Sequence, residues 1–537
     1  MGVMKTPGVY IVEKNAFPNS VVEVATAVPA FVGYTEKADN RNTPLLLRPW
    51  RISSMAEYHQ YFGGPPKPLF KLAEATDRID FRALTLPDKP ESAKGYALAQ
   101  VDGSAGGSYG LYNALRHFFQ NGGGPCYIVS VGDYSQDLDP DQFKKGIAEL
   151  IKEQEPTMLL IPEAVRLGQN ICYDLQEAML AHCGYVMRNR VAILDVWNGD
   201  KPREFPSGDP VAQFRNGLGI NFLDFASSYY PWLNTTVVGE KELSFENIAP
   251  DSAELLKTLL RAELKLEATA PADTGPAIKA LYDAVDGITT DFAAQVKAEQ
   301  KPDAKPLSTD DLAAAVLARK SLLNKTLARI SPLFNTVLTE ARRQLNVMPP
   351  SPAMAGIYTM VDNTRGVWKA PANVSLAGVI SPTVSISSEQ QEDLNVTAQG
   401  KSINAIRAFI GEGVLVWGAR TLDGNSLDWR YVNVRRTMIM LEESCRLAAK
   451  AMVFEPNVAN TWVTIKSMIS NFLTSVWKRG GLMGAVPEDA FSVHVGLGET
   501  MTPDDILEGI LRVTVLVAMV RPAEFIEITF QQQMPKS

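Results

Sequence analysis

"CYIVSVGDYSQDLDPDQFKKGIAELIKEQEPTMLLIP" (126–162) holds two short apolar runs separated by a segment with the spacing of an amphipathic helix. The alternation continues on both sides, from a helix predicted at 111–120 to a strand predicted at 191–197. Apolar strands that alternate with amphipathic helices are typical of a βαβ domain built on a parallel sheet. We therefore predict an α/β domain over residues 105–239.

Length and composition limit the class of protein. A chain of 537 residues is too long for one hydrophobic core, so we expect about two to four domains. The formal net charge of −8 and the lack of a dense basic run argue against nucleic-acid binding. We find no apolar run long enough for a membrane span and no export signal at the N-terminus. The four cysteines lack metal-binding or disulfide spacing, which is typical of a protein made in a cytoplasm.

The other parts of the chain differ in pattern. Residues 1–35 are strand-like, and 36–104 form a variable, Pro-rich connecting region with little periodicity. Residues 240–346 are rich in Ala, Leu, Lys and Glu with helical spacing, which predicts a mostly helical insertion. Residues 351–537 form the last unit. Its predicted late elements are helices at 432–454 and 457–479 and strands at 491–496, 510–520 and 523–532.

Glycine-rich and acidic segments do not complete a cofactor motif. Each candidate for G-x-G-x-x-G has a large third residue (Tyr127, Phe222 or Met501) where helix and strand need a small one. "QGKS" (399–402) ends like a P-loop but lacks the first glycine. "DLDPDQ" (137–142) lacks the glycine and glutamate of a calcium loop, and its acids fit a helix N-cap. No zinc motif is present, so we predict no cofactor and no metal.

"GGSYG" (106–110) matches the G-x-S-x-G nucleophile elbow, with Ser108 as the nucleophile and a helix following. The residues before it make a poor buried strand, no HGGG-type segment is present, and the four histidines are isolated. A flexible Gly/Ser loop that leads into a helix explains the segment better. An α/β hydrolase with Ser108 is the alternative from a different functional class.

Strand-like segments lie at both ends of the chain. "PAEFIEITFQQ" (522–532) alternates between two faces, and "GVYIVE" (8–13) is rich in β-branched and aromatic residues. Their backbone donors and acceptors need partners, either inside their own domain or in a neighbouring subunit that accepts an added strand. The candidates for inter-subunit strand exchange are Val9, Tyr10, Ile11, Val12, Phe525, Ile526, Glu527, Ile528, Thr529 and Phe530.

Several longer segments carry a family resemblance. They are "TPGVYIVE" (6–13), "AVPAFVGYTEKA" (27–38), "FRNGLGINFLDFASSYYPWL" (214–233), "MAGIYTMVDNTRGVWKAPANVSLAGV" (354–379), "LNVTAQGKSINAIRAFIGEGVLVWGARTL" (394–422), "WRYVNVRRTMIMLEESC" (429–445), "VFEPNVANTWVTIKSMISNFLTSVWKRGGLMGA" (453–485), "AFSVHV" (490–495) and "RPAEFIEITFQQ" (521–532). In this order they resemble the contractile tail sheath proteins of phage tails, pyocin-like particles and extracellular injection systems. Residues 240–346 match no part of that pattern, and we interpret them as an outward decoration.

The resemblance implies a multidomain fold of α/β and α+β type. An inner sheath domain would be built from both termini, with residues 1–35 as its N-terminal arm and first part and residues 351–537 as the C-terminal sheath domain. The βαβ domain and the helical insertion would lie outside. Copies would stack as hexameric rings around an inner tube and contract to drive the tube through a target envelope, without an active site. Implied partners are other copies, the inner tube protein, and baseplate and tail-terminator or cap proteins, with no direct membrane insertion. Assembly would take place in a bacterial cytoplasm, and the phage-tail-like particle could be released.

The resemblance also gives a role to "GVLVWGARTLDGNSLDWRYVNVRR" (413–436), which lies between an apolar run and the helix predicted at 432–454. We interpret it as the joint of a lattice-forming domain and not as a reaction site. The joint residues are Trp417, Arg420, Trp429, Arg435 and Arg436. Candidates for contact with the tube are Lys466, Lys478 and Arg479. A scaffold that joins rings but does not contract is a further alternative.

Overall fold

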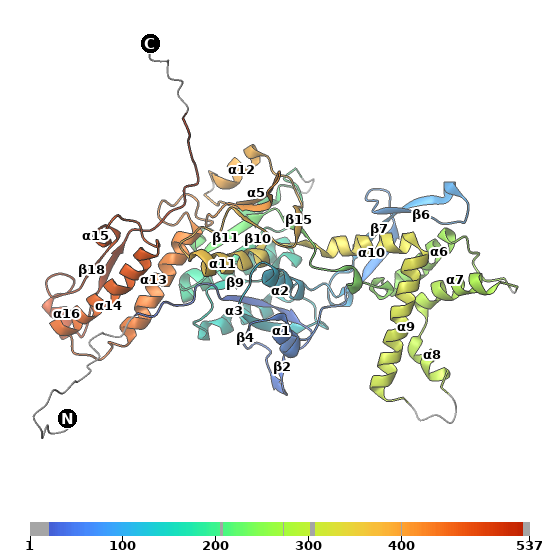
Figure 1. Cartoon of the computed structure of the whole chain (residues 1–537), viewed down its shortest axis with the longest axis horizontal. Helices are drawn as coiled ribbons and strands as arrows, with labels where there is room; N and C mark the ends of the chain where they lie inside the picture. Colours follow the sequence, from blue (N-terminus) through green and yellow to red (C-terminus); the bar gives the residue numbers. More distant parts are fainter. Residues whose placement is uncertain (1–20, 205–207, 272, 301–306, 399, 530–537) are drawn as a thin grey trace, which may run out of the picture.

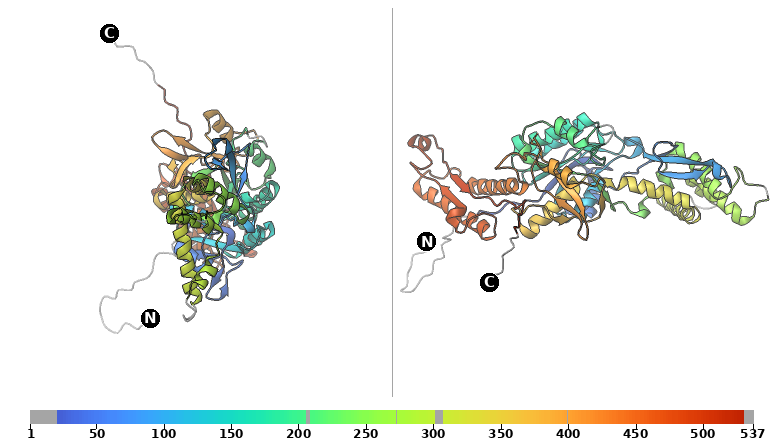
Figure 2. Two further views of the ribbon diagram at one scale, coloured as in Figure 1. Left: turned by 90° about the vertical axis from the view of Figure 1, so that its right-hand side faces the viewer. Right: turned by 90° about the horizontal axis from the view of Figure 1, so that it is seen from above.

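The chain is elongated and consists of three packed units in a row (Figure 1). A computed structural model describes residues 21–204, 208–271, 273–300, 307–398 and 400–529. A central α/β unit lies between two smaller ones. The insertion unit, around helices α6 to α10, lies at one end, and the C-terminal unit, around α13 to α16, lies at the other (Figures 1 and 2).

The central unit is built on a nine-stranded sheet. Its strands, in spatial order, are β14 (Val374–Ser375), β17 (Gly413–Trp417), β16 (Asn404–Phe409), β11 (Ala226–Tyr230), β10 (Val191–Asp195), β9 (Met158–Leu160), β1 (Pro29–Thr35), β8 (Cys126–Asp133) and β4 (Trp50–Ile52). The six strands from β16 to β8 are parallel, and β14, β17 and β4 add antiparallel edges. The predicted parallel sheet is confirmed, because the apolar runs around 126–162 form β8 and β9 of this sheet.

Helices cover both faces of this sheet. In β1, Phe31 contacts Phe118 of α2 (Leu111–Gln120), with ring centroids 5.2 Å apart. The next residue, Val32, faces α3 (Pro140–Glu149) at Gly146, where a Cβ atom would lie 2.7 Å from Val32. Successive strand residues point to opposite faces, so α2 and α3 lie on different sides. A larger residue at position 146 would push α3 away from the sheet.

Two further helices complete these layers. α11 (Ser351–Arg365) packs against α2, and α4 (Gln169–Ala181) packs against α3. All seven residues of β1 and all five of β10 are buried, as expected for strands covered on both faces. β1 therefore belongs to the central unit, although the resemblance assigns residues 1–35 to an inner sheath domain.

The insertion unit combines helices with a small sheet. Its helices are α6 (Ala253–Glu263), α7 (Pro276–Asp286), α8 (Phe292–Ala298), α9 (Thr309–Ile330) and α10 (Pro332–Leu345), and its antiparallel strands are β5 (Phe70–Glu74), β7 (Ala93–Gln100) and β6 (Phe81–Leu84). A separate hydrophobic core joins Phe70 and Leu98 of the sheet to Leu256, Leu327 and Phe334 of the helices.

Residues 70–100 thus contain three strands, although the sequence pattern predicts a connecting region with little periodicity there. The physical reason is that β5 and β6 are only five and four residues long. They contain few apolar positions, so the alternation of buried and exposed residues is too short to distinguish them from a loop. The partners that complete the core lie far along the chain.

The C-terminal unit contains helices α13 (Val432–Lys450), α14 (Ala459–Lys478), α15 (Pro487–Ala490) and α16 (Pro503–Leu507). Two antiparallel strands, β18 (Phe491–His494) and β19 (Thr514–Val517), pair in a sheet of their own. Val21 and Val24 pack against the core of this unit, so the chain at 21–24 and the C-terminal elements lie together. Both predicted helices are present, although α13 ends at Lys450 and not at residue 454.

The last predicted strand differs from β18 and β19. Over its described part, residues 523–529, it belongs to no sheet. The chain leaves the body of the molecule there (Figure 1). None of the helices in the described ranges combines the length and the apolar character that crossing a bilayer requires.

Two buried histidines make the central unit sensitive to acid. Burial lowers the pKa of His117 to about 4, and burial together with the charge of Arg190 does the same for His182. An unfolded histidine has a pKa of about 6.5. The two buried, neutral histidines therefore make their full contribution to the free energy of unfolding above pH 6.5. This contribution is lost as the pH falls toward 4, because the unfolded chain takes up protons that the folded chain does not bind.

We expect His117→Leu to remove part of this loss. Between pH 6.5 and 4, the free energy of unfolding of the wild type should fall by about 3 kcal/mol more than that of the variant. Denaturant titrations at both pH values measure the difference. Parallel pH profiles for wild type and His117→Leu would contradict the prediction.

Candidate functional site

Helix α13 begins where the central sheet ends, and its first turns carry a buried ion pair. Arg436 binds Asp362 of α11 through Nη1–Oδ1 (3.0 Å) and Nη2–Oδ2 (2.6 Å). Nη2 also donates to the carbonyl oxygen of Thr26 at 2.9 Å, and the guanidinium lies 4.7 Å from the ring centroid of Tyr358. The two charged side chains are only 3% and 2% exposed. This pair therefore ties α13, α11 and the chain at Thr26 to one another.

Arg435 makes a second contact between α13 and the central unit. Its guanidinium pairs with Asp224 and lies between two rings, 3.6 Å from the centroid of Trp429 and 4.3 Å from that of Phe225. Burial lowers the pKa of Arg435, and the charge of Asp224 opposes that shift. Stacking on aromatic faces and pairing with a carboxylate are the two interactions that a planar guanidinium makes best.

A third arginine holds the chain near its C-terminal end. Arg420, which is 3% exposed, binds the carboxylate of Glu524 through Nε–Oε1 (3.0 Å) and Nη2–Oε2 (2.6 Å). Tyr431 Oη donates to Oε2 at 3.0 Å, and Asn395 Nδ2 donates to Oε1 at 3.0 Å. We call these four residues the Glu524 clamp. A β-bridge between Arg420 and Tyr431 places the clamp next to the start of α13.

Four of the five predicted joint residues thus meet around the start of α13. Trp417 differs, because it is 38% exposed and packs on Phe409 of the neighbouring strand β16, with centroids 4.7 Å apart. The acidic partners were not predicted. A buried arginine signals that an acid must be near it, but nothing local in the sequence identifies Asp224, Asp362 or Glu524.

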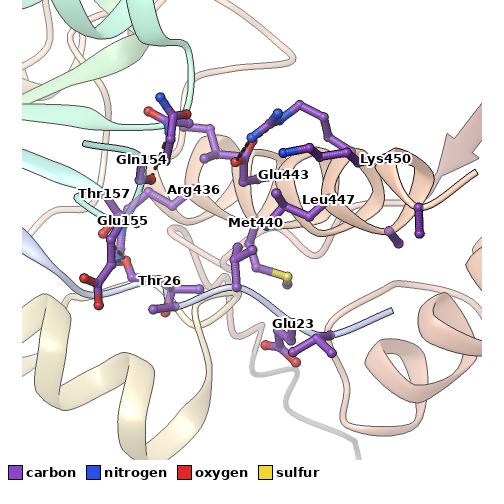
Figure 3. Close-up of a pocket in the computed structure, with 18 of the residues that line it drawn as sticks. Glu23, Thr26, Gln154, Glu155, Thr157, Arg436, Met440, Glu443, Leu447 and Lys450 are labelled. Carbon is purple, nitrogen blue, oxygen red and sulfur yellow. Dashed lines mark hydrogen bonds and ion pairs between the residues drawn. The ribbon is translucent and has the colours of Figure 1, made fainter. Parts of the chain in front are cut away.

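A cavity of about 830 Å³ lies beside this joint (Figure 3). Its lining includes the chain at 22–26, the residues Gln154, Glu155 and Thr157, and one side of α13 from Arg436 to Lys450. Figure 3 shows Glu23 and Thr26 on the side opposite α13, with Gln154 near Arg436 and Lys450 toward the other end. Charged, amide and apolar side chains share the lining, so no one ligand chemistry is favoured.

The structure locates part of the predicted strand-exchange set. Val9, Tyr10, Ile11, Val12 and Phe530 lie outside the described residues. Phe525, Ile526 and Ile528 are 77%, 79% and 71% exposed, and Glu527 and Thr529 are also exposed. Within the part of the chain that the structure describes, these five residues take part in no strand pairing. An alternating, apolar segment is therefore left in solvent in the single chain.

The three basic residues predicted for tube contact have different surroundings. Lys466 and Lys478 are exposed on α14. Arg479, just after α14, forms an ion pair with Glu23 and lies 5.1 Å from the ring centroid of Trp368. Arg479 thus holds the N-terminal side of the chain against the C-terminal unit.

Ser108 lacks the surroundings of a serine nucleophile. It is buried, and its Oγ accepts a hydrogen bond from Arg166 Nη1 at 2.8 Å; no histidine bonds to it among the described residues. The preceding glycines are explained by packing. A Cβ atom at Gly106 would lie 1.9 Å from the carbonyl oxygen of Val101, and Gly107 has a φ of +58°.

The backbone N–H groups at the start of α2 are bound by a side chain of the protein itself. The buried carboxylate of Glu163 accepts hydrogen bonds from the backbone N–H of Gly110 (2.8 Å), Leu111 (3.2 Å) and Tyr34 (2.9 Å). A helix N-terminus attracts an anion, and here a side chain supplies it. The geometry therefore favours a loop that leads into a capped helix.

We expect a fluorophosphonate probe to label the wild type and Ser108→Ala equally weakly. A guanidinium beside Oγ cannot accept the proton that a nucleophilic serine must lose. Mass spectrometry of the treated proteins measures labelling at this position. Strong labelling at Ser108 that disappears in Ser108→Ala would favour the hydrolase.

The other motifs also have structural explanations. Lys401 of "QGKS" is buried, and its Nζ donates to the carbonyl oxygens of Arg215 (2.6 Å) and Leu218. Asp139 caps α3 by accepting from the backbone N–H of Asp141 at 2.9 Å, which confirms the predicted N-cap. No group of three His, Cys, Asp or Glu side chains with metal-binding geometry occurs in the described ranges.

Comparison with known proteins adds independent findings. The family model described as the phage tail sheath C-terminal domain matches residues 425–533, which include most of the joint and Glu524. The tail sheath protein of Vibrio phage KVP40 is 25% identical over 164 residues, or 30% of this chain and 23% of that protein. The tail sheath protein of Burkholderia phage BcepMu is 26% identical over 141 residues, or 25% of this chain and 29% of that protein. The chain thus spans less than a third of the length of these relatives.

Two solved structures resemble almost the whole chain. The contracted sheath complex of PVC, an extracellular contractile injection system, is 26% identical with a TM-score of 0.55 and covers 99% of both chains. The contracted helical sheath of the anti-feeding prophage (AFP) has the same identity and TM-score, over 99% of this chain and 100% of that one. One set of similarities covers the C-terminal domain and the other extends over almost the whole chain, so the chain is similar in sequence and in fold to contractile tail sheath proteins.

Proposed function

We propose that the chain is a structural subunit of a contractile sheath, whose copies stack as hexameric rings around an inner tube and contract to drive that tube through a target envelope. The observation that carries the proposal is the exposed segment 525–529, which is apolar, alternating and unpaired in the described part of its own chain. A segment of this kind is stable when it joins the sheet of another chain.

The small sheet of the C-terminal unit is our candidate acceptor. Two-stranded sheets are marginally stable alone, and β18 and β19 pair only with each other over residues 491–494 and 514–517, as far as the structure describes the chain. Terminal strands of neighbouring copies would extend this sheet at its outer edges. The N-terminal candidates Val9 to Val12 would take part in the same way.

Such an exchange gives mechanical continuity from weak contacts. Each strand hydrogen bond contributes about 0.5–1.5 kcal/mol, and the contact is repeated in every subunit. Interfaces with two alternative packings allow a cooperative switch between an extended and a contracted lattice. The energy for contraction would be stored at assembly, so no nucleotide is required.

The proposed partners follow from this role. Besides other copies, they are a baseplate, a terminator or cap protein, and an inner tube. Lys466 and Lys478 are exposed on α14 and are our candidates for contact with an acidic tube surface. Arg479 is a weaker candidate, since Glu23 already neutralises it. Subunits would be made in the bacterial cytoplasm and become part of a phage-tail-like particle.

Negative-stain microscopy of the purified chain tests the proposal. Long tubes of uniform width are expected, and two classes of tube with different pitch would separate a contractile sheath from a static scaffold. Single globular particles at high protein concentration would overturn it.

A further inference from the structure

We propose that Glu524 is a positioning residue that sets the starting point and register of the strand donated by the C-terminal end. The inference rests on the proposed function, because it concerns how the exchanged strand is presented. It adds a specific residue, located before the exchanged segment itself, whose side chain stays bound to its own subunit.

The clamp holds Glu524 by contacts to both carboxylate oxygens. Besides the bonds to Arg420, Oε1 accepts from Asn395 and Oε2 from Tyr431. Arg420 is itself held, because its Nη1 donates to the carbonyl oxygen of Asn395 at 2.9 Å and its backbone N–H donates to Asn404 Oδ1 at 2.7 Å. A bidentate pair with a fixed guanidinium fixes the carboxylate in position and orientation.

Burial keeps the clamp closed. The side chain of Arg420 is 3% exposed and that of Glu524 is 17% exposed. If Glu524 moved away, the guanidinium of Arg420 would stay buried without a carboxylate, which is strongly unfavourable. An exposed ion pair would exert no comparable constraint.

The clamp lies at the boundary between bound and free chain. Before it, Met519 forms a β-bridge with Leu482, and the carbonyl oxygen of Val520 accepts from Asn433 Nδ2 at 3.2 Å. Directly after it, Phe525 is 77% exposed. Glu524 is therefore the last residue that the described fold holds in place.

This location matters because the side chains of a strand alternate in direction. A shift of one residue turns every side chain of the strand to the opposite face. With Glu524 fixed, the side chains of Ile526 and Ile528 point to a defined face when the strand reaches a neighbouring sheet. Fixing the first residue also lowers the entropy cost of adding the strand.

The test uses the full chain with Glu524→Gln, which keeps the shape of the side chain and removes its charge. We expect the variant to fold and to elongate tubes about tenfold more slowly, because the free strand end is present at a lower effective concentration. Light scattering follows elongation. Glu508→Gln, an exposed residue of the same unit, is the matched control and should elongate like the wild type.

Disulfide cross-linking between copies measures the register of the donated strand on the acceptor sheet. Ile526→Cys in the donor is combined with single cysteines at the acceptor positions Ser492, His494, Thr514 and Leu516. With Glu524 intact, one acceptor position should dominate; with Glu524→Gln, neighbouring positions should cross-link to similar extents. A loss of stability alone would not change this pattern.

A second variant keeps the test valid if Glu524→Gln does not fold. In Arg420→Met/Glu524→Leu both charges are absent, and replacement of a buried pair by apolar residues is commonly tolerated. It should fold yet show the same slow elongation and spread of cross-links.

The outcomes separate the two hypotheses. Elongation at the rate of the wild type, with one dominant cross-link in either clamp variant, overturns the role of Glu524. If the chain with an intact clamp gives no cross-link at any of the four acceptor positions, the proposed strand exchange with this sheet fails, and with it the positioning role.

Discussion

A chain shortened by residues 525–537 should form no tubes and should remain a folded monomer. The exposed alternating residues 525–529 contribute to none of the three hydrophobic cores, so their loss leaves the packing within one subunit unchanged. The same residues are the proposed link to the next subunit. Without them, each lattice contact loses its main-chain hydrogen bonds.

The position of the truncation decides whether the experiment tests the exchanged segment alone. A deletion that begins at residue 523 would also remove Glu524 and leave the buried guanidinium of Arg420 without its carboxylate. A cut after Glu524 keeps the clamp. Far-UV circular dichroism and the thermal midpoint should then match the full chain, and electron microscopy should show no tubes.

A milder truncation serves as the control. Removal of residues 536–537 alone should leave tube formation unchanged, because it spares the whole alternating segment. Tubes of normal length from the chain that lacks 525–537 would contradict the proposed strand exchange, whatever the behaviour of the clamp variants.

The second large effect is expected at the buried pair of Arg436 and Asp362. Asp362→Ala should lower the free energy of unfolding by about 3–5 kcal/mol, because the guanidinium of Arg436 stays buried after it loses its carboxylate partner. Denaturant titration measures the change. Since the pair joins α13 to α11, the C-terminal unit should loosen from the central one, which limited proteolysis would detect.

An exposed acid gives the matched comparison. Asp428 lies 3.7 Å from Arg521, with side chains 79% and 49% exposed. Asp428→Ala should therefore change the free energy of unfolding by less than about 1 kcal/mol. If Asp362→Ala had an equally small effect, the pair would not hold the two units together as we argue.

Local pattern was sufficient for part of the fold. The runs around 126–162 predicted β8, α3 and β9, and the parallel pairing of the sheet followed from their alternation. The apolar spacing after residue 430 predicted α13 and α14. These elements were predictable because their buried faces repeat at the period of the helix or strand, and that signal is contained within a few turns of chain.

The tertiary structure alone decided the acidic partners of the joint residues and the division into units. Arg420 pairs with Glu524 at a sequence separation of 104 residues, Arg436 with Asp362 at 74, and Arg435 with Asp224 at 211. The sheet at 70–100 likewise finds its core partners in helices beyond residue 250.

The sequence by itself therefore determined the elements with a strong periodic pattern, the central parallel sheet and the alternating segment near the C-terminal end. Only the folded chain decided which acid neutralises each buried arginine and where the free end begins. The physical reason is the range of the interactions. Periodic burial is recorded in neighbouring residues, whereas the pairing of buried charges depends on which distant segments the packing brings within a few ångströms.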